Sequence, residues 1–224
     1  MKLLLCINSL SEFPEVHRQI QMDNGAGETP PFLSTGVYAN HEITICETGY
    51  GIFQSTYKIT KALCRERFHL ALKFGRCKSY HPEIEVGTVV NVIKDKPGDL
   101  GYYQDGSFID YYESRLLDAS AFPHFRNSFL NMNNSYMNVF LPIRKVVAVT
   151  MNSSDKHKVP ALRERYKADI ETDDGLGFVY ACMSERQPFY QLQVVQQNLV
   201  TEESDEIKAK LMADQHLLSI LQKL

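Results

Sequence analysis

The sequence predicts one α/β domain that extends over residues 1–224 and contains a mainly parallel or mixed sheet. Three observations predict it. Runs rich in β-forming residues alternate with segments of helical periodicity, glycine turns follow several of these runs, and no stretch rich in Pro, Gly and Ser separates two halves. A chain of 224 residues with 44% hydrophobic content is also long enough to bury a substantial core.

The first part of the chain repeats the order strand, turn, helix. An apolar run at the start predicts a buried strand, and Pro14 suits the first turn of the helix that follows. Two glycines and two prolines predict a loop or an irregular hairpin after that helix. The predicted elements are a strand at 2–8, a helix at 14–22, a loop at 23–35, a strand at 43–48, a glycine turn at 49–51 and a helix at 52–63.

The same periodicities predict the strands and helices in the second part of the chain. Phe68 to Phe74 predicts a strand, and Gly75 predicts a turn at its end. The other predicted elements are strands at 86–94 and 141–150, helices at 159–166 and 174–186, a strand at 189–195 and an amphipathic helix at 206–224.

Composition excludes several classes of protein. A net charge of -3 gives no basic footprint for nucleic acid, so no nucleic-acid partner is expected. The five cysteines and seven histidines show no metal-ligand spacing, which predicts no metal and reduced thiols in a cytoplasmic protein. No apolar run is long enough for a membrane span or a signal peptide. Neither a complete dinucleotide fingerprint nor a P-loop lysine is present, and no cofactor is expected.

In sheets of this kind, ligands bind where loops leave the carboxyl ends of strands. The segments after Asn8, Thr48, Phe74, Thr150 and Val195 are therefore the predicted places for a site. After Thr48, a glycine turn that includes Gly51 leads into a helix N-terminus, where free N–H groups favour an anion or hydroxyls. A simple tight turn explains the two glycines equally well.

Carboxylates gather at two places near these strand ends. Four of them fall within residues 169–174, directly before a hydrophobic helix. They are either helix caps and dipole partners or acceptors for sugar hydroxyls, and their crowding predicts that at least one pKa is raised. Glu12 and Glu15 follow the first strand, where a carboxylate either positions a water molecule for attack or is simply solvated.

Taken in order along the chain, these segments resemble the nucleosidase branch of the nucleoside phosphorylase superfamily. The resemblance is greatest to futalosine hydrolase and extends to methylthioadenosine/S-adenosylhomocysteine nucleosidase. It runs over the whole chain and rests on residues 48–52, 72–75, 86–90, 98–101, 149–152, 170–175, 188–189 and 196–198.

The resemblance implies a three-layer sandwich around a central mixed sheet, as in phosphorylases and hydrolases of this superfamily. It implies an enzyme that hydrolyses the N-glycosidic bond of a purine-type nucleoside, a small-molecule partner. It also implies a homodimer or a higher homo-oligomer in which partner residues complete the pocket.

The resemblance also assigns roles to residues. Glu12 would position or deprotonate water, with Glu15 as the alternative residue for this role. Asp174 would bind ribose hydroxyls. Asn198 would face the base. Gln197 would do so instead if this segment aligns with the family pattern without a one-residue shift. Met151 and Asn152 would line the base pocket beside the turn that contains Gly51.

Several residues depart from the family pattern. Asp174 is one methylene shorter than the family glutamate, Asp173 replaces a methionine, Lys78 stands where a glycine is usual, and Gln193 replaces an arginine. An ion pair between Lys78 and Asp173 would compensate two of these changes in a remodelled substrate pocket. The alternatives are a catalytically inactive nucleoside-binding relative and a phosphorylase in which Arg76 and Lys78 bind phosphate.

Overall fold

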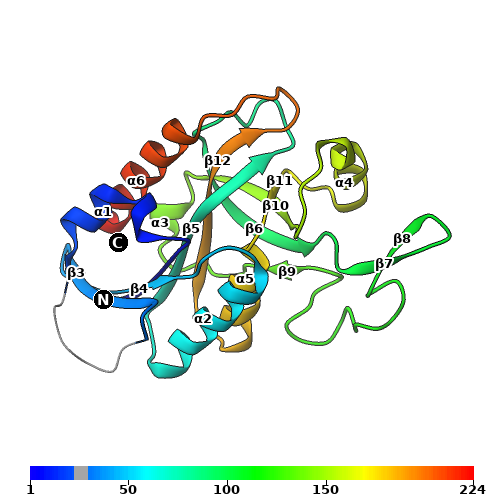
Figure 1. Ribbon diagram of the computed structural model, residues 1–224. Coiled ribbons are helices and arrows are strands. Elements are labelled where there is room, and N and C mark those ends of the chain that lie inside the picture. Colours follow the sequence, from blue (N-terminus) through cyan, green and yellow to red (C-terminus); the bar gives the residue numbers. More distant parts are fainter. Residues whose placement is uncertain (23–29) are drawn as a thin grey trace.

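A ten-stranded mixed sheet with helices on both faces carries the candidate site (Figure 1). The computed structural model describes residues 1–22 and 30–224. Across the sheet the strands are β11 (Ile170–Thr172), β10 (Arg144–Thr150), β6 (Val89–Pro97), β12 (Phe189–Asn198), β5 (Leu70–Ser79), β1 (Lys2–Ile7), β4 (His41–Glu47), β3 (Leu33–Tyr38) and β2 (Gln21–Met22), while β9 (Phe129–Leu130) pairs with β6.

The remaining elements are helices and one separate hairpin. The helices are η1 (Leu10–Glu12), α1 (Pro14–Gln19), α2 (Ile52–Arg65), α3 (Met137–Phe140), η2 (Lys156–Lys158), α4 (Val159–Tyr166), α5 (Gly175–Ser184) and α6 (Glu206–Lys223). The hairpin of β7 (Gly101–Gln104) and β8 (Ser107–Asp110) projects away from the main sheet (Figure 1). None of the helices in the described part of the chain has the length and apolarity that a membrane crossing requires.

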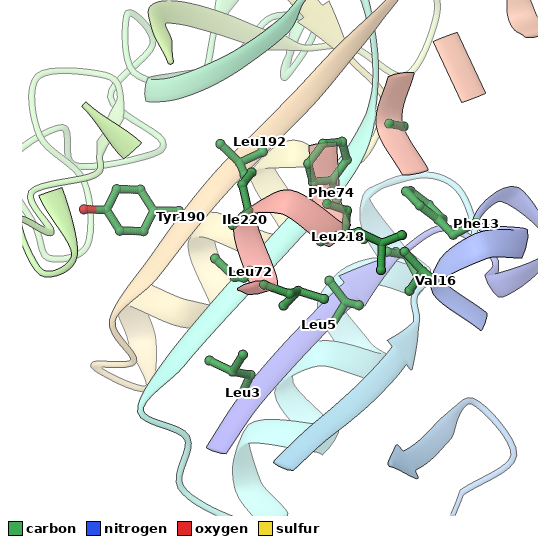
Figure 2. Packing of buried hydrophobic residues seen from close by; sticks show 14 of the residues in the cluster. Leu3, Leu5, Phe13, Val16, Leu72, Phe74, Tyr190, Leu192, Leu218 and Ile220 are labelled. Carbon is green, nitrogen blue, oxygen red and sulfur yellow. The ribbon is translucent and has the colours of Figure 1, made fainter. Parts of the chain in front are cut away.

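Alternation along β1 places apolar side chains in two core clusters, one on each face of the sheet. Leu3 and Leu5 of β1 pack with side chains of α1 and α6, and Figure 2 shows residues of β5 and β12 converging on the same cluster. Leu4 and Cys6 point to the opposite face, where they pack against α2 and α5. The predicted three-layer arrangement around a mixed sheet is therefore confirmed.

β5 is long enough to close part of the sheet into a ring. It pairs with β1 and β12 in parallel, and its end then pairs antiparallel with β11, so that Lys78 lies opposite Glu171 and Ser79 opposite Ile170. Because β11, β10, β6 and β12 connect back to β5, these five strands enclose a small apolar core. The closure brings the end of β5 against residues that are distant in sequence.

The predicted turn at Gly75 is wrong, because β5 continues through it to Ser79. Half-buried Arg76 and Lys78 alternate with buried Cys77 and Ser79, which is the period of a strand. A Cβ atom on residue 75 would lie only 2.7 Å from Oε1 of Gln193 on β12, so this glycine allows a close approach between strands.

The other differences are mostly in element ends. The predicted helix at 14–22 ends at Gln19, and β12 runs three residues past the predicted end. Residues 33–35, predicted as loop, belong to β3, whereas residues 23–29 lie outside the described residues. The helix predicted at 159–166 is confirmed, and α2 and α6 lie where helices are predicted.

Candidate functional site

A cavity of about 360 Å³, here called the central cavity, opens at the carboxyl ends of the parallel strands. Every predicted ligand segment contributes to it. Asn8 follows β1, Tyr50 follows β4, Met151 and Asn152 follow β10, and the ends of β5 and β12 supply the remaining walls, including Arg76, Lys78 and Gln196. A cavity therefore lies at the strand ends where the sequence predicts a site.

Glu12 lies directly behind this cavity and does not line it. Its side chain is buried, and Oε1 accepts hydrogen bonds from the Tyr50 hydroxyl at 2.6 Å and from Nη2 of Arg76 at 2.7 Å. The hydrogen bond to Glu12 raises the pKa of Tyr50. Arg76 also reaches Glu206 at the start of α6, at 3.2 Å. Tyr50 and Arg76, which donate hydrogen bonds to Glu12, both line the cavity.

Glu15, the reserve for Glu12, points elsewhere. Its carboxylate accepts hydrogen bonds from Arg18 at 2.6 Å and Gln19 at 2.5 Å on the outer face of α1. Its backbone N–H is bound by Asp214 of α6 at 2.8 Å. Of the two carboxylates, only Glu12 contacts residues that line the central cavity.

Asp174 is withdrawn from the cavity into the protein core. Its carboxylate is only 1% exposed and accepts hydrogen bonds from Lys73, at 2.7 Å, and from the Asn8 amide, at 2.8 Å. Lys73 is itself 0% exposed. Because Asn8 lines the cavity, its amide lies between the cavity and the buried ion pair. The ligand-facing position expected for Asp174 is occupied instead by Asn8 and Asp173.

Asp174 is the residue before α5, yet its side chain does not cap that helix. Two threonines do so: Oγ1 of Thr172 accepts the N–H of Gly175 at 3.2 Å, and Oγ1 of Thr150 accepts the N–H of Leu176 at 3.0 Å. The capping interpretation of the acidic segment is therefore wrong for Asp174, whose carboxylate is used by Lys73.

Lys78 and Asp173 both line the cavity, but the predicted ion pair between them is wrong. Lys78 lies 3.4 Å from Glu171, because the antiparallel pairing of β5 with β11 places these two residues opposite each other. The Tyr80 hydroxyl donates to the second oxygen of Glu171 at 2.6 Å. Burial raises the pKa of Asp173, with a further contribution from neighbouring Asp174, as the crowding predicts.

Neither Asn198 nor Gln197 lines the central cavity. The Asn198 amide donates to the carbonyls of His81 and Ile84, and its oxygen accepts the N–H groups of Val200 and Thr201, so this side chain holds two loops together. An irregularity between Val195 and Gln197 changes the register with β5, and Gln196 is the residue that lines the cavity. The sequence pattern contains no sign of this bulge.

Met151 and Asn152 line the cavity as expected, whereas Gly51 does not. Gly51 is the N-cap of α2 with a φ of 79°, a backbone conformation that favours glycine. It therefore supports the tight-turn interpretation, and its neighbour Tyr50 is the residue that reaches the cavity. Asn152 is fixed by Asp99, which accepts its backbone N–H at 2.7 Å and its side-chain amide at 2.9 Å.

A buried polar layer beneath the cavity is absent from the sequence predictions. Asp95 accepts hydrogen bonds from Thr150 at 2.8 Å and from Gln191 at 3.0 Å. Burial raises the pKa of Asp95 to about 6, although both hydrogen bonds oppose the shift. The signal that could have located this layer is the presence of polar residues inside otherwise apolar strands, with Lys73 between Leu72 and Phe74 as the strongest example.

Among the described residues, no group of three or more His, Cys, Asp or Glu side chains is arranged to hold a metal ion. The chemistry available at the cavity is thus that of hydrogen-bonding amides, the cations Arg76 and Lys78, the carboxylates Glu171 and Asp173, and the apolar surface of Met151.

No protein-family model matches the chain, and no curated protein matches it. Several solved structures, however, are similar to it over almost their whole length. The chain is similar to the native futalosine hydrolase of Helicobacter pylori strain 26695, with a TM-score of 0.80, 15% identity and coverage of 100% of this chain and 98% of that one.

Two nucleosidases are similar over comparable lengths. The S-adenosylhomocysteine nucleosidase of Streptococcus pyogenes gives a TM-score of 0.78 at 14% identity, covering 100% and 97% of the two chains. The 5'-methylthioadenosine/S-adenosylhomocysteine nucleosidase of Campylobacter jejuni gives 0.73 at 16% identity, covering 100% of both. The chain has the fold of these nucleosidases.

Proposed function

We propose that this chain, which has a nucleosidase fold, binds a purine-type nucleoside in the central cavity without cleaving its N-glycosidic bond. One observation carries the proposal: Glu12 and Asp174, the two carboxylates to which the resemblance assigns water activation and ribose binding, are each held by a cation at 2.7 Å and do not line the cavity.

The cavity suits a ligand of this class. Its volume of about 360 Å³ falls in the range of roughly 300–1,000 Å³ that is usual for small-molecule sites. Met151 and Tyr50 offer apolar and aromatic surface for a base. Asn8 and Thr172 offer hydrogen-bonding groups, and Asp173 offers a carboxylate that can accept from sugar hydroxyls.

Cleavage requires more than binding. The departing base leaves a sugar with oxocarbenium character, so the site must supply an activated water and a negative charge that faces the ring. Here Oε1 of Glu12 already accepts hydrogen bonds from Tyr50 and Arg76. Asp174 is paired with Lys73 inside the core, and its side chain is only 1% exposed. The arrangement supports recognition and gives little support to bond breaking.

A nucleosidase is the second candidate, because Glu12 lies only one side chain behind the cavity wall. Hydrolysis would require Tyr50 and Arg76 to move aside and expose Oε1 to a water molecule. A phosphorylase is less favoured, since Arg76 and Lys78 are already bound to Glu12 and Glu171, and Asp173 adds negative charge to the same cavity.

The test is to incubate the purified protein with futalosine, methylthioadenosine and inosine, with and without phosphate, and to measure both base release and the melting temperature. We expect at least one nucleoside to raise the melting temperature without base release. Release without phosphate would establish the nucleosidase, and release that depends on phosphate would establish the phosphorylase. No change in either measurement would overturn the proposal.

A variant that fills the cavity localises the binding. Ser154 is exposed and lines the central cavity, so Ser154→Trp should abolish the ligand-induced rise in melting temperature. Ser204 is also exposed but lies outside the lining, and Ser204→Trp is the matched control that should retain the rise.

A further inference from the structure

A second cavity, here called the hairpin cavity, lies between the β7–β8 hairpin and α4. Its volume is also about 360 Å³. Aromatic side chains form much of its wall: Tyr103 and Phe108 come from the hairpin, and Tyr166 comes from the end of α4. Leu162 of α4 adds aliphatic surface. Neither the resemblance nor the proposed function assigns a role to this space.

Arg165 fastens the hairpin to α4 and thereby maintains the cavity. Its guanidinium carbon lies 5.3 Å from the ring centre of Phe108 and 5.5 Å from that of Tyr166. It also donates to Asp110 at 3.1 Å and to Glu113 at 2.6 Å. Because both carboxylates already neutralise Arg165, this cation serves as a fixed part of the wall.

Met151 lines both the hairpin cavity and the central cavity. A Cβ atom on residue 98 would lie 2.1 Å from its sulfur, so Gly98 is what allows Met151 to occupy this position. Next to it, the hydrogen bonds from Asn152 to Asp99 join the wall of one cavity to that of the other. The partition therefore includes an unbranched thioether side chain, which changes rotamer readily.

We propose that the hairpin cavity receives an aromatic substituent carried on the base of the nucleoside bound in the central cavity; this inference rests on the proposed function. Met151 and Asn152 are the residues expected beside the base, so a group attached to the base edge meets this partition first. The rings of Tyr103, Phe108 and Tyr166 offer edge-to-face contacts to another ring.

Lys158 supports an aromatic occupant over an aliphatic one. Its side chain lines the cavity, and it forms no ion pair with any side chain in the described part of the chain. An ammonium group over an aromatic face is attracted by the negative potential of the ring. The chemical class is thus a purine nucleoside with an aromatic group on its base, for which N6-benzyladenosine is the probe.

The test compares adenosine with N6-benzyladenosine in titration calorimetry. We expect N6-benzyladenosine to bind the wild-type protein at least about tenfold more tightly, because the benzyl ring is buried. Ala161 is exposed and lines only the hairpin cavity, so Ala161→Phe should remove this preference and leave the affinity for adenosine unchanged. Glu164→Phe, an exposed position of α4 outside the lining, is the control that should keep the preference.

The outcomes separate this inference from the proposed function. Equal affinity of the wild-type protein for the two nucleosides would overturn the inference and leave the proposed function in place. Binding of neither nucleoside would overturn both. The oligomeric state of wild type and Ala161→Phe is measured in parallel by light scattering. A change of mass in the variant would assign the cavity to a second copy of the chain and would also overturn the inference.

Discussion

Two carboxylate–cation pairs flank β5, and they have the same length in very different surroundings. Arg76 and Glu12 lie 2.7 Å apart at the rim of the central cavity, with side chains 18% and 9% exposed. Lys73 and Asp174 also lie 2.7 Å apart, but their side chains are 0% and 1% exposed. The two cations are three residues apart and point to opposite faces of the strand.

Burial decides what each pair can do. The Arg76–Glu12 pair is the more exposed of the two, and Arg76 divides its donors between Glu12 and Glu206. A buried pair cannot open without leaving an uncompensated charge in a medium of low polarity. Glu12 would therefore become available only if both Arg76 and Tyr50 moved aside, whereas Asp174 has become part of the core.

Lys73→Met is expected to have the largest effect. The variant leaves the Asp174 carboxylate buried without its cation, which should lower the free energy of unfolding by about 3–5 kcal/mol. Urea denaturation measures it, and the double variant Lys73→Met/Asp174→Asn should recover most of the loss, because it removes the unpaired charge. A loss below about 1 kcal/mol in the single variant would show that the pair behaves like the one at the rim.

The second prediction concerns Asp95, which shares the buried surroundings of Asp174. Since the pKa of Asp95 is about 6 in the folded protein against the usual 3.8, the folded state binds this proton more tightly than the unfolded state. The resulting stabilisation is complete below about pH 4, is lost as pH rises to about 6, and amounts to about 1–3 kcal/mol.

Asp95→Asn tests this dependence. Urea denaturation at several values between pH 4 and 7 should give a wild-type stability that falls relative to the variant as pH rises to about 6, with a constant difference above it. If the two proteins keep the same difference throughout, the carboxyl group of Asp95 does not titrate in this interval.

The smallest effect is expected for Arg76→Met, the counterpart of Lys73→Met on the same strand. Its loss of stability should be at most about 1 kcal/mol, because Arg76 is partly exposed and Tyr50 still donates to Glu12 in the variant. The two methionine variants therefore form a matched comparison in a single urea series. If Arg76→Met destabilises as much as Lys73→Met, the distinction between rim and core is wrong.

Local patterns in the sequence predict most of the fold. Alternating apolar residues locate β1 and β4, and the glycine turn correctly predicts where α2 begins. The candidate site depends on pairings that no local pattern contains. Lys78 meets Glu171 because β5 and β11 pair across about ninety residues of sequence, and Gln196 reaches the cavity only through the irregularity in β12. The charge of Arg76 alone suggests a phosphate ligand, whereas in the structure Arg76 pairs with Glu12.

The long β5 has a consequence for how the chain is made. Its residues Leu70–Ser79 pair with β1 early in the sequence, but its other neighbours are β12 at Phe189–Asn198 and, at its end, β11. During synthesis, one edge of β5 therefore remains unpaired until more than a hundred further residues have emerged. Such non-local pairing slows folding and exposes the growing chain to association with other chains. The ring of strands that shapes the cavity can close only after β12 has emerged.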